Sequence, residues 1–159
     1  MHVSTRRFGE IDIPREKIIT MAKPILGFES LTGFCLIEAE EMAPFMWLQA
    51  IEDPNVAFIV VNPRVFFPDY RIEVNRAELA ELKITRVEDV ETFVVATVPA
   101  DPKRMSVNLQ GPVIINTANN LAKQLVMVNS QYQVKHYLME IPDVPEDRGV
   151  TRERETVSA

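Results

Sequence analysis

Short apolar runs rich in β-branched residues, separated by turn residues, dominate this sequence and limit the folds open to it. Two such runs, Val113–Ile115 and Leu125–Val128, flank the polar segment Asn116–Asn120. Asparagine tolerates left-handed backbone angles and bonds to its own backbone, so this segment predicts a turn. Pro112 lacks a backbone N–H and therefore belongs at the start of a strand or at a sheet edge. The pattern predicts a long hairpin whose two faces are mostly buried.

Similar runs recur along the whole chain, with Gly, Pro and Asn between them. The expected strands are His2–Ile13 (one or two strands), Lys17–Met21, Gly33–Ile37, Phe45–Ile51, Val56–Val61, Tyr70–Val74, Glu91–Val98, Met105–Leu109, Val113–Ile115, Ala122–Val128 and Tyr132–Met139. Asn75 with Glu78 three residues later predicts the start of one short helix, and Thr85 with Glu88 predicts a single further turn.

Many short strands at close spacing are typical of a mainly β protein, either a small antiparallel barrel or a sandwich. Several of the expected strands are apolar on both faces. A closed or semi-closed β-barrel, with one short helix or a loop covering its outside, explains those strands better than a flat sandwich does.

The length of 159 residues favours a single domain, which we expect to span residues 1–141. The remaining segment, Pro142–Ala159, is charged and nearly free of large apolar residues. Such a segment cannot bury enough apolar surface to offset its ordering entropy, so it is predicted to be a disordered tail.

Several absences favour a cytoplasmic protein. No apolar run approaches the roughly 18 residues of a membrane span, and no apolar stretch typical of a signal peptide follows the first charged residues. The single cysteine, Cys35, cannot form an internal disulfide. We therefore expect no membrane contact.

The net charge of −6 is unevenly distributed. Residues 29–101 hold 14 acidic and 5 basic residues, a net charge of −9 for that segment. One interpretation is solubility alone, and the other is an acidic face that meets a basic protein. Nucleic acid is disfavoured as a direct ligand, because phosphate binding needs Lys and Arg clustered on one face.

The sequence predicts neither an enzyme nor a metal or cofactor site. Cys35, His2 and His136 are too few to build a zinc site, and Cys35 stands in an apolar run expected to be core. The five glycines match neither a dinucleotide fingerprint nor a phosphate-binding loop, and no serine stands in a G-x-S-x-G elbow. Most carboxylates stand in turns and connections, where they are ordinarily solvated.

Two stretches are candidates for protein binding. Phe66–Tyr70 places three aromatic residues within five, and either phenylalanine could be an exposed anchor or could fill the barrel. Met42, Phe45 and Met46 stand beside two glutamates, which gives apolar contact surface rimmed by acid. The candidate partner-binding residues are Glu40, Glu41, Met42, Phe45, Phe66, Phe67, Asp69 and Tyr70.

Several pieces of the sequence stand in the order seen in a known family. They are Gly27-Phe28-Glu29, Pro44-Phe45 with Leu48-Gln49, Ala57-Phe58 with Asn62-Pro63, Phe66–Tyr70, and Asn108–Asn116 with Ala122-Lys123-Gln124. On these pieces the chain resembles the flagellar assembly factor FliW family over residues 3–138. It departs from the family at Met21–Leu26, where members often read close to F-P-x-G-L-P.

The resemblance implies a function that composition does not. Members of this family bind the translational repressor CsrA and stop it from blocking flagellin mRNA, and they also bind flagellin in the cytoplasm. The implied circuit is a partner switch, in which free flagellin sequesters the factor until flagellin is exported. The resemblance assigns no binding residues.

Two alternatives stay open. One is a small ligand- or flavin-binding β-barrel, which would need a basic residue near a glycine or a helix N-terminus to hold phosphate. The only adjacent basic pairs are Arg6-Arg7 and Lys103-Arg104, and neither is expected to open a helix. The other alternative is a structural adaptor with no regulatory partner.

Overall fold

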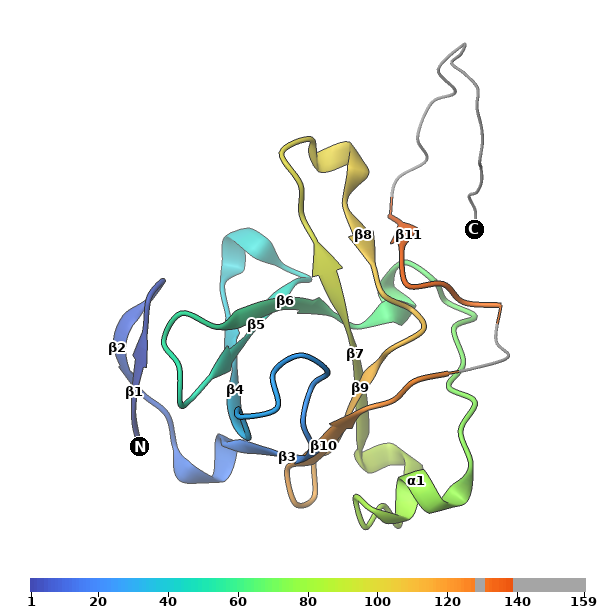
Figure 1. Cartoon of the computed structure of the whole chain (residues 1–159), viewed down its shortest axis with the longest axis horizontal. Coiled ribbons are helices and arrows are strands. Elements are labelled where there is room, and N and C mark those ends of the chain that lie inside the picture. Colours follow the sequence, from blue (N-terminus) through green and yellow to red (C-terminus); the bar gives the residue numbers. More distant parts are fainter. Residues whose placement is uncertain (128–130, 139–159) are drawn as a thin grey trace.

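A closed ring of β-strands forms the body of the protein (Figure 1). The computed structural model describes residues 1–127 and 131–138. Its strands are β1 (His2–Thr5), β2 (Gly9–Asp12), β3 (Ile19–Lys23), β4 (Gly33–Glu38), β5 (Met46–Ala50), β6 (Ala57–Val61), β7 (Val90–Thr97), β8 (Ser106–Val107), β9 (Val113–Asn116), β10 (Leu121–Gln124) and β11 (His136–Tyr137). The helix α1 spans Arg76–Ala80, and five 3₁₀ turns are η1 (Arg15–Lys17), η2 (Glu40–Met42), η3 (Pro63–Val65), η4 (Val87–Asp89) and η5 (Pro102–Arg104).

Seven strands close the ring in the order β7-β6-β5-β4-β3-β10-β9, because β9 also pairs with β7. The mainly β, closed-barrel prediction is therefore confirmed. One detail differs, since β10 pairs with β3 in parallel while the other ring pairs are antiparallel. A closed ring with an odd number of strands cannot alternate direction throughout, so at least one parallel pair is required.

The inside of the ring is filled by side chains. Phe34, Leu48, Val60 and Phe93 belong to a buried cluster contributed by strands on all sides of the ring. The loop between β3 and β4 lies across one end of the ring in Figure 1, and its Ile25 and Leu31 are buried in the same cluster. A loop, and not the Phe66–Tyr70 segment, therefore plugs the barrel.

The helix α1 covers the outside of β9 and β10. Leu82, just after the helix, packs with Ile114 and Leu125 in a second buried cluster. The predicted N-cap is confirmed, because Asn75 Oδ1 accepts a hydrogen bond from the Glu78 backbone N–H at 3.1 Å. The predicted turn at Thr85 is displaced, since the 3₁₀ turn η4 follows Arg86 and no side chain caps it.

A buried lysine that the sequence analysis missed ties α1 to the ring. Lys123 on β10 is 1% exposed, and its Nζ lies 2.8 Å from Glu81 Oε1 and 3.3 Å from Glu78 Oε1. The hydrogen bond from Lys123 lowers the pKa of the Glu81 carboxyl. A buried ammonium needs such partners because desolvation alone would make its charge very costly.

The hairpin predicted from the two apolar runs is confirmed. β9 and β10 are antiparallel with Asn116 opposite Leu121, and the intervening turn places Asn120 at a φ of 58°. All four β9 residues are buried. The second strand ends at Gln124, four residues before its predicted end at Val128, and Val128 itself lies outside the described residues.

The strand predicted at Tyr70–Val74 is wrong, although its alternation is real. Tyr70 is buried, Ile72 and Val74 are half-buried, and the residues between them are exposed. Side chains take the place of a partner strand: Arg71 N–H donates to the Tyr132 hydroxyl at 3.0 Å and Glu73 N–H to the Met127 sulfur at 3.3 Å. Alternation of apolar and polar residues shows that one face of a segment is covered, and it does not require a hydrogen-bonded neighbouring strand.

Other predicted strands are shorter or shifted. Lys17 belongs to the 3₁₀ turn η1 and not to a strand, so β3 begins at Ile19. The strands β8 and β11 contain two residues each. The predicted tail, Pro142–Ala159, lies outside the described residues, and the domain limits of 1–141 stay a prediction. None of the helices described is long and apolar enough to cross a membrane.

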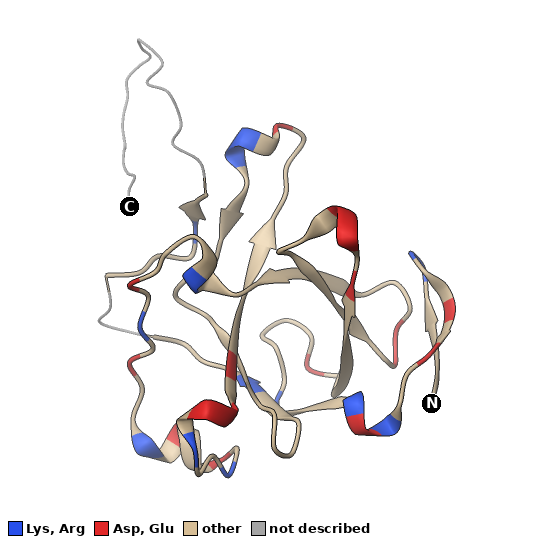
Figure 2. Ribbon diagram, turned by 180° about the vertical axis from the view of Figure 1, so that it is seen from behind, with Lys and Arg blue, Asp and Glu red and all other residues tan. Residues whose placement is uncertain are grey.

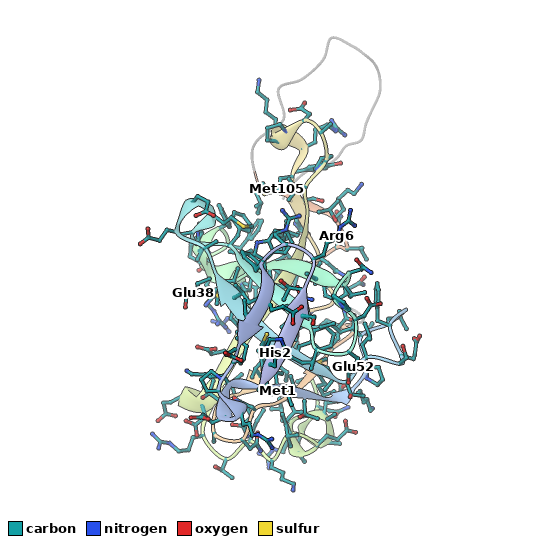
Figure 3. All side chains as sticks on the ribbon, turned by 90° about the vertical axis from the view of Figure 1, so that its left-hand side faces the viewer. Met1, His2, Arg6, Glu38, Glu52 and Met105 are labelled. Carbon is teal, nitrogen blue, oxygen red and sulfur yellow. The ribbon has the colours of Figure 1, made fainter. Side chains whose placement is uncertain are left out.

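The first two strands form a separate hairpin on the outside of the ring (Figure 3). The guanidinium of Arg7 lies 4.2 Å from the centre of the Trp47 ring, and Phe8 meets the same ring edge-on at 6.4 Å. Val3 on β1 is buried. Cation–π and edge contacts of this kind dock the hairpin onto β5.

Candidate functional site

Aromatic side chains from distant parts of the chain line a groove of about 450 Å³ at one side of the barrel. The lining residues are Phe66, Phe67, Pro68, Asp69, Tyr70, Leu109, Gln131, Tyr132 and His136. The first five follow η3, and the others come from the chain before β9 and from the segment that leads into β11. The groove therefore joins the Phe66–Tyr70 segment to Leu109 and to residues 131–136, and the last of these segments lies more than 60 positions further along the chain.

Local turn chemistry sets the position of the first segment. Asn62 Oδ1 accepts from the Arg64 N–H at 2.9 Å, and Pro63 follows at the first position of η3. Asparagine before proline is a typical start for such a turn, since the missing proline N–H needs no partner there. The Phe67 N–H then donates to the Pro63 carbonyl at 2.8 Å, which fixes the backbone of the turn at the two phenylalanines.

The two phenylalanines have different environments. Phe66 is 37% exposed, and its ring lies against Phe45 with centroids 5.8 Å apart. Phe67 is half-buried, packs on the cluster around Val61 and Val94, and meets the His136 ring edge-on at 5.8 Å. Phe66 therefore presents an apolar face to solvent, whereas Phe67 is largely part of the packing.

Tyr70 forms the floor of the groove. It is 1% exposed, and its hydroxyl donates to the Leu109 carbonyl at 2.7 Å. Its ring lies 4.6 Å from that of Tyr132. Burial raises the pKa of this phenol far above the ordinary value, so it stays a hydrogen-bond donor. Tyr70 can shape the groove but offers almost no surface to a partner, while its neighbour Asp69 is exposed.

The second predicted patch meets the groove through Phe45. Glu40 and Glu41 are exposed on η2, and Met42 is half-buried on the same turn. Phe45 is half-buried and forms the contact with Phe66. We call the surface formed by Glu40, Glu41, Met42, Phe45 and Phe66 the acidic shelf. The structure thus brings together two stretches that the sequence analysis treated separately.

No metal-binding arrangement accompanies these surfaces in the part of the chain that the structure describes. No three His, Cys, Asp or Glu side chains there gather closely enough to hold a metal ion. Cys35 is buried, and burial raises the pKa of its thiol. The groove and the acidic shelf offer a partner apolar contact and charge.

The match to known proteins covers the groove, the shelf and the ring together. A family model described as FliW protein matches residues 2–138. This chain belongs to the FliW family. The resemblance seen in the sequence is thereby confirmed.

Individual FliW relatives give the same result. The chain is 39% identical over 141 residues to the flagellar assembly factor FliW of Alkaliphilus metalliredigens, which covers 88% of this chain and 87% of the relative. It is 40% identical over 136 residues to that of Geobacter sulfurreducens, covering 86% and 85%. A crystal structure of the flagellar assembly factor FliW matches with a TM-score of 0.83 and 32% identity, covering 89% of this chain and 99% of that one.

Five lining residues of this groove were not among the predicted site residues: Pro68, Leu109, Gln131, Tyr132 and His136. Leu109, Tyr132 and His136 stand in apolar or mixed stretches far along the chain from Phe66. Leu109 lies in the family piece Asn108–Asn116, whereas the sequence neighbours of Tyr132 and His136 carry no motif. Tyr132 and Tyr137 are aromatic residues of the predicted last strand Tyr132–Met139, but their sequence does not reveal which other segment that strand meets.

We expect His136 to make the docking of the last strand sensitive to pH. The Gln133 N–H donates to His136 Nε2 at 2.8 Å, and the Gln133 carbonyl accepts from the Leu109 N–H at 3.1 Å. Burial lowers the pKa of His136, so the ring is neutral at pH 7. The unfolded state then binds the proton more readily, so stability from this site is full above about pH 6.5 and falls as the pH drops below it.

We expect the melting temperature of the wild-type protein to fall relative to that of His136→Gln between about pH 6.5 and pH 5. The variant is the matched reference because it cannot titrate at this position, while His2 remains in both proteins. His2 acts in the opposite sense, since bonds to Glu10 and Asp12 raise its pKa. Parallel melting curves for the two proteins over this range would contradict the assignment.

Proposed function

We propose that this chain is a cytoplasmic flagellar assembly factor that acts by binding and not by catalysis. It binds the translational repressor CsrA, relieves repression of flagellin mRNA, and also binds flagellin. The observation that carries this proposal is the FliW-family match over residues 2–138, which includes every described strand. The relatives named above are themselves called flagellar assembly factors.

The acidic shelf is suited to a basic partner. Figure 2 shows acidic residues on η2 at the edge of the barrel. A protein that binds mRNA must carry basic surface, and an acidic counterpart speeds its encounter and aligns it. Met42, Phe45 and Phe66 supply the apolar contact that charge alone does not, since aromatic residues dominate binding hot spots.

The proposed regulation is a partner switch. Free flagellin holds the factor, and export of flagellin releases the factor to bind the repressor. Such a switch requires only that the two partners reduce each other's affinity for this chain. It needs no chemical step, in keeping with a site of apolar groove and charged shelf.

A pull-down with purified components tests the proposal. The chain is immobilised and offered purified CsrA, purified flagellin, and both together. We expect each protein to be retained alone, and we expect added flagellin to lower the amount of CsrA retained. Failure to retain either protein would refute the corresponding part of the proposal. An absorbance spectrum of the purified chain tests the alternative of a flavin-binding barrel.

Association with CsrA is expected to slow markedly as salt increases. Exposed charges are screened beyond about 8 Å at 0.15 M salt, and residues 29–101 carry 14 acidic against 5 basic residues. Stopped-flow association rates between about 20 and 300 mM salt, which bracket that value, measure the effect. A rate constant that does not change across this range would show that charge does not steer the encounter.

A further inference from the structure

The groove and the acidic shelf differ in the charge that surrounds them. Three basic residues stand at or next to the groove lining, and Asp69 is the one acidic residue in that lining. Arg64 Nε donates to the carbonyl of Tyr70 in the groove floor at 3.2 Å. The Arg104 guanidinium lies 5.4 Å from the centre of the Tyr137 ring, and Tyr137 directly follows the lining residue His136 in the chain. Lys135 directly precedes His136. We call Arg64, Arg104 and Lys135 the basic rim.

The charges of the basic rim are open to a partner. All three residues are exposed. Within residues 1–127 and 131–138, the ion pairs involve other side chains, so none of the carboxylates described there neutralises the rim. In Figure 2 the basic segments of η3 and η5 lie on the side of β8 and β11, apart from the acidic turn η2.

The floor of the groove is apolar and preformed. Phe67, Tyr70 and Tyr132 pack against one another or against the barrel, and burial keeps His136 uncharged at pH 7. Rigid aromatic surfaces bind apolar side chains with little loss of conformational entropy. The sign of the charge around such a surface then selects the partner, because like charges that face each other across an interface repel.

We propose that the groove receives a segment of flagellin in which apolar side chains are flanked by carboxylates, while the acidic shelf receives the basic repressor. This assignment rests on the proposed function, in which both proteins are partners. Phe66 belongs to both surfaces, since it lines the groove and contacts Phe45 on the shelf. The two partners therefore compete where the surfaces meet.

Charge reversal on each surface tests the assignment. Wild type, Lys135→Glu, Arg104→Glu/Lys135→Glu and Glu40→Lys/Glu41→Lys are each titrated with purified full-length flagellin and, separately, with purified CsrA. Lys17→Glu is the matched control, because Lys17 is also exposed but stands on η1 at the other side of the ring (Figure 1).

We expect the double reversal at the rim to weaken flagellin binding by about tenfold or more and Lys135→Glu to weaken it by about threefold. Neither change should weaken CsrA binding. The reversal on the shelf should weaken CsrA binding by about tenfold and leave flagellin binding unweakened. Lys17→Glu should change either affinity by less than about twofold.

The outcomes separate the two levels of the proposal. If wild type binds no flagellin, the proposed function itself is wrong. If wild type binds flagellin but the rim variants behave like Lys17→Glu, the groove assignment is overturned and the function stands. Loss of CsrA binding in the rim variants would also overturn the assignment. Lys135→Glu protects the test against misfolding, because the Lys135 side chain is exposed and enters no ion pair within the described residues.

Discussion

Phe66→Ala is expected to weaken CsrA binding by about 30-fold, or about 2 kcal/mol, with little change in stability. Phe66 is 37% exposed and rests its ring on Phe45, so it offers a supported apolar face beside the acidic shelf. Removal of such a face takes away contact area in the complex but opens no cavity in the free protein. A titration with CsrA and a melting curve on the same preparation measure the two quantities.

Phe67→Ala is the matched control, because it makes the same truncation one residue away. Phe67 packs on the cluster around Val61 and Val94 and contacts His136, so its loss leaves a gap in the barrel wall. We expect the free energy of unfolding to fall by about 2–4 kcal/mol, at the lower end of Phe→Ala costs because the ring is only half-buried. The assignment is wrong if Phe66→Ala destabilises the protein as much as Phe67→Ala and leaves the affinity for CsrA intact.

Asn116→Ala is expected to lower the free energy of unfolding by about 3 kcal/mol, since each buried polar group left without a partner costs about 1–3 kcal/mol. Asn116 is 1% exposed. Its Nδ2 donates to the carbonyls of Leu82 at 2.9 Å and Lys83 at 3.3 Å, and its Oδ1 accepts from the Ala118 N–H at 3.0 Å. The side chain therefore joins the hairpin to the segment after α1.

Asn119→Ala provides the comparison, because Asn119 stands in the same turn but is exposed. It also donates to the Leu82 carbonyl, at 3.1 Å, so it tests the same acceptor from the solvent side. We expect Asn119→Ala to cost about 1 kcal/mol or less, as for an ordinary exposed hydrogen bond. Urea denaturation of both variants measures the difference. Equal losses of unfolding free energy in the two variants would show that the burial of Asn116 adds nothing to the stability that its side chain contributes.

Local chemistry explains why some elements were predictable. The Asn75 cap and the hairpin around Asn116–Asn120 depend on residues a few positions apart, and the structure confirms both. The closed mainly β ring followed from the density of short apolar runs, which leaves few other ways to bury both faces. The pair of phenylalanines was also open to interpretation, since either ring could be anchor or core.

Strand pairing around the ring was not accessible to the same reasoning. The parallel pair of β10 with β3 joins residues about 100 positions apart, and no local pattern specifies it. The Tyr70–Val74 segment alternates as a strand does, yet it bonds to the side chains of Tyr132 and Met127. Sequence periodicity reports which face is covered, and only the tertiary structure decides what covers it.

The sequence by itself determined the mainly β class, the turns, the helix cap, the uneven charge and the family, because each depends on residue type and order. The tertiary structure decided that Phe45 meets Phe66, that Tyr132 and His136 complete the groove, and that Lys123 is buried beside Glu81. These contacts join residues between about 20 and 70 positions apart. Their formation depends on how the ring closes, and that closure is a property of the whole chain.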